Sequence, residues 1–219
     1  MIKLVLFDLD GTLVNSLYDL ADSCNYALES LGFATHETEK YKYFVGNGMP
    51  KLVERILPAD KLDNELHKKT LDIFMNRYRE HFVDKTCLYE GIAELIESIK
   101  AKGIKIGVVS NKAHEMALRV IEKLFPENTF DMIYGKIEGF PTKPDSALTL
   151  KVIDEMGVKP CETVFIGDSG MDAQTAVNAG CIGIGVLWGF REKQELIENG
   201  ADYIAENPTE ILKIIEEIK

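Results

Sequence analysis

The chain has 219 residues, and its 46% hydrophobic and 28% charged content is typical of a globular protein and excludes disordered, collagen-like and disulfide-framework classes. Its 36 acidic and 25 basic side chains leave a net charge of −11. No basic run is longer than a pair such as Lys68-Lys69, so we expect no nucleic-acid partner. Because the acidic excess repels phosphorylated molecules at long range, an anion site must be built locally from cations, helix N-termini or a metal.

The cysteines and the apolar stretches point to a reducing, aqueous compartment. The four cysteines form no C-x-x-C pair, which argues against a disulfide scaffold and against a zinc site; they are Cys24, Cys87, Cys161 and Cys181. No apolar stretch reaches the ~20 residues that a membrane-spanning helix needs. We therefore expect a cytoplasmic protein with no membrane partner.

Short apolar runs alternate with helix-period segments along most of the chain. Buried strands are predicted at Ile2–Phe7, Ile104–Val109, Thr163–Gly167 and Cys181–Val186. Helices are predicted at Gly91–Lys102, Ala113–Leu124, Asp145–Met156, Met171–Ala179 and Pro208–Ile218. This alternation predicts an α/β fold, with a doubly wound, Rossmann-like core around a parallel sheet.

Residues 16–84 break this alternation, because they contain helical patterns only. We predict that they form a helical cap, inserted into a core made of residues 1–15 and 85–219. The simplest place for such a cap is over the carboxyl edge of the sheet, where ligands bind in this class of fold.

Three signals mark the inside of the predicted cap. Ser16 followed by Asp19 predicts a capping box at the start of its first helix. The glycine-rich segment Gly46–Gly48 breaks the region in the middle, and a helix from about Lys61 to His81 leads back to the core.

The sequence Asp8-Leu9-Asp10-Gly11-Thr12 follows directly on the first predicted strand. Taken singly, each aspartate is a common turn or cap residue. Here two carboxylates stand one residue apart, and a glycine lets the backbone turn sharply after them. Thr12 is expected to orient the loop that carries Asp10, or to be a simple turn residue.

Polar residues also follow the other predicted strands. Ser110-Asn111 come after the second strand, Asp168 and Asp172 come after the third, and Lys143 precedes the third of the predicted helices. Singly they are consistent with cap, turn and surface residues. Because the carboxyl ends of parallel strands meet at one edge, we expect them to converge with Asp8 into a Mg²⁺ site beside an anion pocket.

These segments, in this order and spacing, resemble the haloacid dehalogenase superfamily over nearly the whole chain. The resemblance implies a phosphatase with a helical cap, in which Asp8 is the nucleophile and Asp10 the general acid/base. It also implies ligands for the phosphate group, namely Ser110, Asn111 and Lys143. For Mg²⁺ it implies Asp8, Asp168, Asp172 and the backbone carbonyl of Asp10.

The expected chemistry is physically consistent with these residues. A carboxylate attacks phosphorus only when the charge of the phosphoryl group is neutralised, a task for Mg²⁺ and Lys143. Asp8 would then become an aspartyl phosphate. Asp10 would protonate the leaving alkoxide and later deprotonate the attacking water. Because position 10 is an acid and not an apolar residue, carbon–halogen cleavage is disfavoured.

The cap segment Val45–Leu57 is similar to that of phosphoglycolate phosphatases. Its candidate substrate-binding residues are Gly46, Asn47, Gly48, Lys51 and Arg55. Glycines let a loop approach the site closely, and either Lys51 or Arg55 would bind the carboxylate of the substrate. Asn15 and Ser146 depart from residues common in related phosphatases.

Three alternatives remain open on the sequence alone. Met49 stands where β-phosphoglucomutases of this superfamily often have an arginine, which argues against that activity. An inorganic pyrophosphatase with the same cap is possible, because the remaining cations suit a second phosphate group. A non-catalytic phosphate-metabolite sensor is the remote alternative, and both a monomer and a homodimer fit the sequence.

Overall fold

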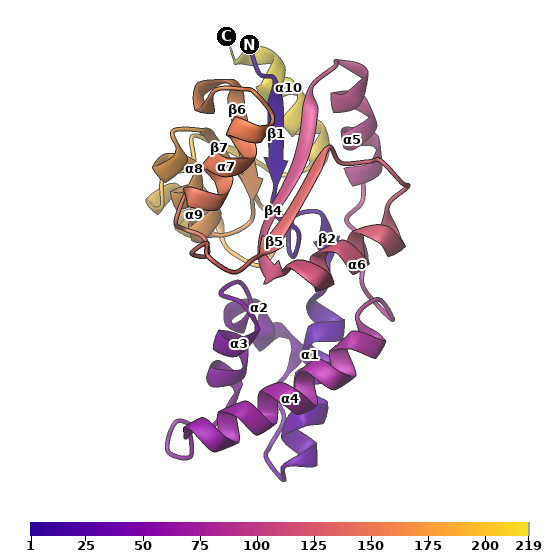
Figure 1. The fold of residues 1–219 in the computed structure, drawn as a ribbon, viewed down its shortest axis with the longest axis vertical. Coiled ribbons are helices and arrows are strands. Elements are labelled where there is room, and N and C mark those ends of the chain that lie inside the picture. The colour runs from indigo at the N-terminus through magenta and orange to yellow at the C-terminus, as the bar shows by residue number, and fades with distance from the viewer. Residues whose placement is uncertain (219) are drawn as a thin grey trace.

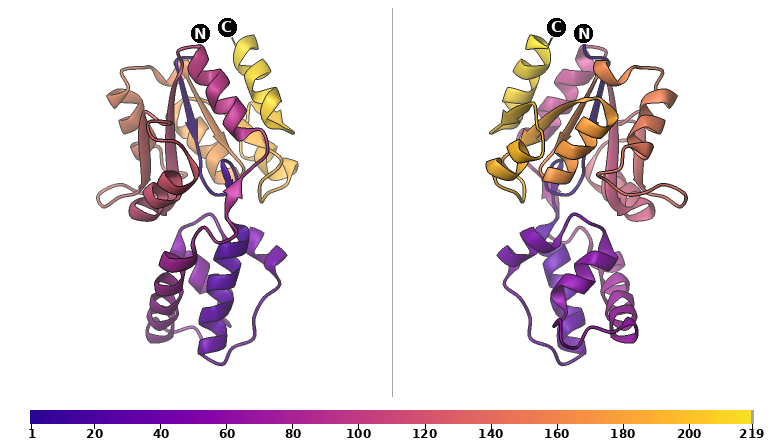
Figure 2. Two further views of the ribbon diagram at one scale, coloured as in Figure 1. Left: turned by 90° about the vertical axis from the view of Figure 1, so that its right-hand side faces the viewer. Right: turned by 90° about the vertical axis from the view of Figure 1, so that its left-hand side faces the viewer.

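The computed structural model describes residues 1–218, which form two lobes joined by two short segments (Figures 1 and 2). The larger lobe contains a sheet with helices on both faces, and both chain ends lie at its far end. The smaller lobe is helical and faces the carboxyl end of the central strand β1 (Figure 1).

The sheet has six parallel strands in the order β5-β4-β1-β6-β7-β8. Their bounds are β1 (Leu4–Phe7), β4 (Lys105–Ala113), β5 (Met132–Lys136), β6 (Thr163–Gly167), β7 (Ile182–Val186) and β8 (Tyr203–Ala205). All four residues of β1 are buried. Because side chains alternate along a strand, Val5 and Phe7 pack into one apolar cluster and Leu4 and Leu6 into the other.

Helices cover both faces of the sheet (Figure 2). One face carries α5 (Ile92–Ala101), α6 (His114–Leu124) and α10 (Pro208–Glu217). The other carries α7 (Ala147–Glu155), α8 (Gly170–Ala179) and α9 (Lys193–Glu198). A 3₁₀ turn at Pro160–Glu162 precedes β6. The predicted doubly wound α/β core is confirmed.

The smaller lobe, here called the helical lobe, spans α1 to α4. Its elements are α1 (Leu17–Ser30), a 3₁₀ turn (Thr38–Lys40), α2 (Tyr41–Phe44), α3 (Met49–Ile56) and α4 (Asn64–His81). A two-stranded antiparallel ribbon joins it to the core, formed by β2 (Val14–Asn15) and β3 (Cys87–Leu88). Within residues 1–218, every helix is too short or too polar to cross a lipid bilayer.

Several elements differ from the sequence-based expectation. The edge strands β5 and β8 and the short helix α9 were not predicted, because they are short and partly exposed and so lack a continuous apolar run. Strand β4 continues to Ala113, four residues beyond its predicted end. Ser110 and Asn111 therefore belong to the strand and do not follow it.

The predicted capping box at Ser16 and Asp19 is wrong. Ser16 is the N-cap residue of α1 but makes no side-chain cap bond, because its hydroxyl donates to Asp10 at 2.6 Å. Asp19 is buried, and its carboxylate accepts hydrogen bonds from the backbone N–H groups of Lys85 and Thr86 and from the Thr86 hydroxyl. Asp19 thus fastens α1 to the segment that returns to the core.

Replacing Asp19 by Ala should destabilise the protein, because it leaves the buried donors of Thr86 and the partly buried N–H of Lys85 without an acceptor. Each such group costs roughly 1–3 kcal/mol, so we expect the thermal midpoint to fall by roughly 5–10 °C in calorimetry. Asp22→Ala is the matched control, since it removes a carboxylate from the same helix that forms only an exposed ion pair with Lys85. Equal midpoints for the two variants would contradict this role of Asp19.

Candidate active site

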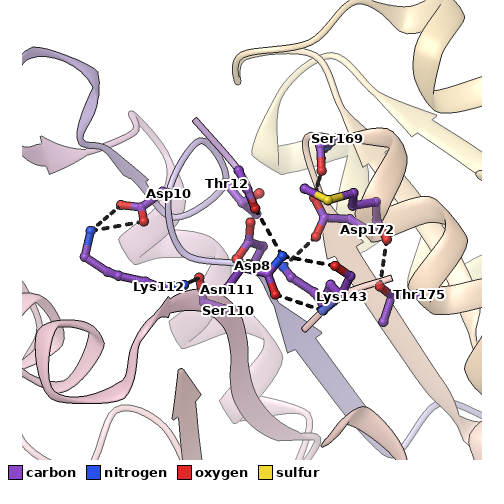
Figure 3. A network of polar contacts seen from close by, with 12 residues as sticks. Asp8, Asp10, Thr12, Ser110, Asn111, Lys112, Lys143, Ser169, Asp172 and Thr175 are labelled. Atoms are coloured by element: carbon purple, nitrogen blue, oxygen red, sulfur yellow. Dashed lines mark hydrogen bonds and ion pairs between the residues drawn. The ribbon is translucent and has the colours of Figure 1, made fainter. Parts of the chain in front are cut away.

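The carboxyl ends of three neighbouring strands bring the predicted site residues together (Figure 3). Strand β1 leads directly into Asp8, β6 leads into Asp168, and Ser110 lies near the end of β4. Because β4, β1 and β6 are adjacent and parallel, their ends share one edge of the sheet. This edge faces the helical lobe (Figure 1).

Lys143 joins two of the carboxylates in the interior. Its Nζ lies 2.9 Å from Oδ1 of Asp8 and 2.6 Å from Oδ1 of Asp172. Burial lowers the pKa of Lys143, but Asp172 and Asp8 outweigh this effect, so its pKa stays above the usual value and the ammonium stays charged. The other oxygen of Asp172 accepts from the backbone N–H and hydroxyl of Ser169, which closes a capping box at the start of α8.

Asn111 clamps the backbone that carries Lys143. Its side-chain oxygen accepts from the Lys143 N–H at 2.8 Å, and its side-chain N–H donates to the Lys143 carbonyl at 3.2 Å. The same amide nitrogen lies 3.1 Å from the carbonyl oxygen of Gly46 in the helical lobe. Asn111 thus positions the lysine and contacts the glycine-rich loop.

Three aspartates form an oxygen-rich cluster. One carboxylate oxygen each from Asp8, Asp168 and Asp172 lie within 4.8 Å of one another. Burial, with neighbouring negative charge, raises the pKa of Asp8 to about 6 although Lys143 opposes the shift. The pKa of Asp168 is raised to about 8, mainly by burial and next by the negative charges of Asp172 and Asp8.

Both pKa values are raised chiefly by burial, and for Asp168 the negative charges of Asp172 and Asp8 add to this effect. Asp168 and Asp172 are buried and Asp8 is largely buried, and the ammonium of Lys143 pairs with Asp8 and Asp172. A divalent cation would offset the excess of carboxylate charge over the one ammonium, and carboxylate oxygens are the ligands that Mg²⁺ prefers. The donor set therefore fits a magnesium ion.

The turn after Asp10 leaves no space for a side chain. Gly11 has a φ of +89°, and a Cβ there would lie 2.3 Å from Oδ2 of Asp168. The hydroxyl of Thr12 donates to Oδ1 of Asp168 at 3.3 Å, and Phe190 N–H donates to Oδ2 at 2.8 Å. Thr12 therefore contacts the acid cluster, and its predicted role in orienting the loop that carries Asp10 stays a prediction.

Asp10 has its own set of partners, separate from the cluster (Figure 3). Nζ of Lys112 lies 3.0 Å from each of its carboxylate oxygens, and the hydroxyl of Ser16 donates to Oδ1. Lys112 was assigned no role from the sequence. Its position in the sequence could have identified it as a site residue, because it lies two residues beyond Ser110 near the end of a central strand.

A small cavity lies between the sheet edge and the helical lobe. Its volume is about 30 Å³, enough for one or two water molecules and too small for a phosphate ester. The core contributes Asp8, Asp10, Ser110, Asn111 and Lys112, and the helical lobe contributes Leu20, Val45, Gly46, Gly48, Met49 and Leu52. The wall formed by the helical lobe is therefore apolar apart from its backbone.

Lys51, Arg55 and Asn47 do not line this cavity. Lys51 forms an exposed ion pair with Glu54 at 2.5 Å. Arg55 donates to the carbonyl of Phe44 at 2.8 Å and to the side-chain oxygen of Asn47 at 2.7 Å, so it braces the glycine-rich loop from behind. Of the predicted substrate-binding residues of the lobe, only Gly46 and Gly48 border the cavity.

Solved structures of other proteins share this fold over nearly the whole chain. A predicted phosphoglycolate phosphatase from Haemophilus somnus superposes with a TM-score of 0.91 at 30% sequence identity, covering 97% of each chain. A haloacid dehalogenase-like hydrolase from Streptococcus pneumoniae superposes with a TM-score of 0.86 at 24% identity, covering 97% of this chain and 98% of the other. At 24% identity, the similarity to the Streptococcus pneumoniae protein shows a shared fold only.

Sequence comparison agrees with the structural one. Phosphoglycolate phosphatase from Chromobacterium violaceum is 33% identical over 219 aligned residues, covering 98% of this chain and 97% of the relative. The model of the haloacid dehalogenase-like hydrolase family matches residues 5–186. The resemblance drawn from the motifs is confirmed, and the chain belongs to the haloacid dehalogenase-like hydrolase family.

Proposed function

We propose that the protein is a Mg²⁺-dependent phosphatase that hydrolyses small phosphorylated metabolites through an aspartyl-phosphate intermediate. The observation that carries the proposal is the position of Asp8. Its carboxylate lies beside the ammonium of Lys143, belongs to the acid cluster and borders the cavity, and a second carboxylate, Asp10, borders the same cavity. A nucleophile and a general acid/base are thus available at one place.

The metal would be held by the carboxylates of Asp8, Asp168 and Asp172 and by the backbone carbonyl of Asp10. When bound, Mg²⁺ offsets negative charge on the phosphoryl oxygens. This ligand set is supported by the short separations in the acid cluster and by its excess of negative charge.

The chain's own residues would carry out the chemistry in two steps. In the first, a carboxylate oxygen of Asp8 attacks phosphorus, the bond to the leaving oxygen breaks, and Asp10 gives that oxygen a proton. In the second, Asp10 takes a proton from a water molecule that attacks the same phosphorus, which releases phosphate and restores Asp8. Lys143 and Ser110 would bind the phosphoryl oxygens during both steps.

The helical lobe would act as a cap, with residues 16–84 moving against a core of residues 1–15 and 85–219. Two observations support this division: within residues 1–218 the chain crosses between the lobes only at the β2–β3 ribbon, and the cavity is smaller than a phosphate ester. Substrate entry would require the lobe to move away. Its return would exclude bulk water and strengthen the electrostatic interactions around the phosphoryl group.

Phosphoglycolate is the proposed substrate, on the strength of the named activity of relatives such as the Chromobacterium violaceum protein. Because Lys51 and Arg55 are engaged elsewhere, the substrate carboxylate would be recognised at the Gly46–Gly48 loop. Met49 borders the cavity, and an apolar side chain there offers no charge to a second phosphate group. This disfavours the mutase and pyrophosphatase alternatives. A cytoplasmic location and a monomeric or homodimeric state stay predictions.

Phosphate release across a panel of substrates tests the proposal. The panel contains phosphoglycolate, pyrophosphate, β-glucose 1-phosphate, glycerol phosphate and nucleotides, each with excess Mg²⁺ and with EDTA. We expect phosphoglycolate to give the highest kcat/KM and EDTA to abolish turnover. Asp8→Asn should lose at least about 1,000-fold in kcat, whereas Asp60→Asn, an exposed aspartate of the helical lobe, should keep wild-type activity.

Other outcomes of the panel separate the alternatives. A flat profile would leave a general phosphatase, and preference for pyrophosphate would indicate a pyrophosphatase. Conversion of β-glucose 1-phosphate to the 6-phosphate would indicate a mutase. Absence of phosphate release from every compound would contradict the proposal and favour a sensor.

The raised pKa of Asp168 predicts a linkage between pH, metal and stability. Without a divalent cation, the folded protein keeps a proton on Asp168 up to about pH 8, whereas the unfolded chain loses it near pH 3.8. The folded state then binds more protons, so stability falls as pH rises through this interval. Mg²⁺ at roughly 100 times its Kd should raise the thermal midpoint at pH 8 by roughly 5–10 °C.

Asp168→Asn provides the decisive variant for this linkage. It should raise the midpoint in EDTA at pH 8, because it removes a buried carboxylate next to two others. It should also lose the stabilisation by Mg²⁺. Scanning calorimetry at several pH values measures both effects, and an unchanged response to Mg²⁺ in the variant would remove Asp168 from the ligand set.

A further inference from the structure

Lys112 is a buried cation that the proposed chemistry has not used. Its side chain is completely shielded from solvent, although it is a lysine. Its Nζ lies 3.0 Å from both carboxylate oxygens of Asp10 and 2.7 Å from the hydroxyl of Tyr78. An ammonium has three N–H groups, so the three oxygens match its donors one for one.

The partners of Lys112 come from both lobes. Lys112 lies on β4 of the core, and Asp10 follows β1, whereas Tyr78 lies on α4 of the helical lobe. Tyr78 is itself fully buried, and its ring stacks on Phe74 with a centroid separation of 5.5 Å. The hydroxyl that contacts Lys112 is therefore held by the packing of the helical lobe.

This arrangement restrains the Asp10 carboxylate more than a surface ion pair would. Burying the ammonium of Lys112 without partners would destabilise the folded protein, so the ammonium stays in contact with Asp10 and Tyr78. Contact of one nitrogen with both oxygens restrains the position of the carboxylate group. If the helical lobe moves away, the hydroxyl of Tyr78 leaves with it, and the ammonium loses one of its three restraints.

We infer that Lys112 and Tyr78 are positioning residues for Asp10, and that they hold this carboxylate in its reactive place only while the helical lobe rests on the core. The inference builds on the proposed function, in which Asp10 transfers protons. Neither residue donates a proton to the substrate. Lys112 acts through Asp10, and Tyr78 acts through Lys112.

The consequence depends on the leaving group. An alkyl phosphate needs a proton on its leaving oxygen when the bond to phosphorus breaks, and Asp10 supplies it. A nitrophenolate leaves without a proton, so its departure does not require a well-placed acid. Hydrolysis of the aspartyl phosphate still needs Asp10 as a base, whichever leaving group departed.

Tyr78→Phe is the first test, because it removes one hydroxyl and keeps the ring. For the alkyl phosphate that the wild type hydrolyses fastest, kcat/KM should fall roughly 10-fold. For p-nitrophenyl phosphate, kcat/KM should change by less than about 2-fold, since the first step needs no acid. Tyr41→Phe is the matched control: it removes another buried tyrosine hydroxyl from the helical lobe, one that donates to Asn25, and should leave both values unchanged.

Lys112→Met is the stronger variant, with kcat/KM for the alkyl phosphate lower by roughly 100-fold. With p-nitrophenyl phosphate it should show a rapid burst of about one nitrophenol per active site, followed by slow turnover, because the second step lacks its base. Lys112→Arg, which keeps a cation, should recover part of the loss with the alkyl substrate. If Lys112→Met does not fold, Tyr78→Phe still decides the question.

Equal losses for the alkyl and the aryl substrate in Tyr78→Phe would overturn the inference, because they would indicate a general disturbance of the site. The inference would also be overturned if Tyr41→Phe lowered kcat/KM for the alkyl phosphate but not for p-nitrophenyl phosphate. Failure of the underlying function looks different: the wild type would then release phosphate from neither substrate.

Discussion

The site is organised around an imbalance of buried charge. Three carboxylates, those of Asp8, Asp168 and Asp172, lie together, and Lys143 pairs with Asp8 and Asp172. Burying charges is costly unless each is compensated, so this cluster is stable only with protons or a divalent cation in addition to the lysine. The core supports it with rigid elements: strands β1 and β6, the capping box of α8, and a glycine turn at Gly11 that admits no side chain.

A second buried lysine, Lys112, pairs with the carboxylate of Asp10 outside the acid cluster. Lys112 is bound to Asp10, and the acid cluster is bound to Lys143, so each proposed catalytic carboxylate has its own cation (Figure 3). The two cations differ in their surroundings. Lys143 has partners from the core alone, whereas Lys112 also contacts Tyr78 of the helical lobe. The helical lobe thus reaches the Asp10 carboxylate through two hydroxyls: that of Ser16, at the start of α1, contacts it directly, and that of Tyr78 contacts it through Lys112.

The convergence of Asp8, Asp168 and Lys143 was predictable from the sequence. Polar residues that follow buried parallel strands must meet at one edge, and this geometry depends only on strand order and direction. Lys143 follows no predicted strand, and it was expected at this edge from its place in the loop before the helix predicted at Asp145–Met156. The parallel sheet was also predictable, because its central strands are continuous apolar runs.

The residues of the helical lobe were harder to predict. Orientation around a helix decides whether Lys51 or Arg55 faces the cavity, and hydrogen bonds to Glu54 and the Phe44 carbonyl turn both away. The contacts of Asp19 with Thr86 and of Lys112 with Tyr78 join segments far apart in the chain. Local patterns such as a capping box carry no information about such partners, so tertiary contacts overrode them.

In the proposed mechanism, Asp8 becomes covalently phosphorylated during turnover. The direct measurement is to quench the enzyme during turnover of phosphoglycolate with Mg²⁺, reduce it with borohydride, and map its peptides by mass spectrometry. Borohydride converts an aspartyl phosphate to homoserine, so we expect homoserine at position 8 only when substrate and Mg²⁺ are both present. Active turnover with no homoserine at position 8, or with homoserine at another aspartate, would show that Asp8 is not the nucleophile.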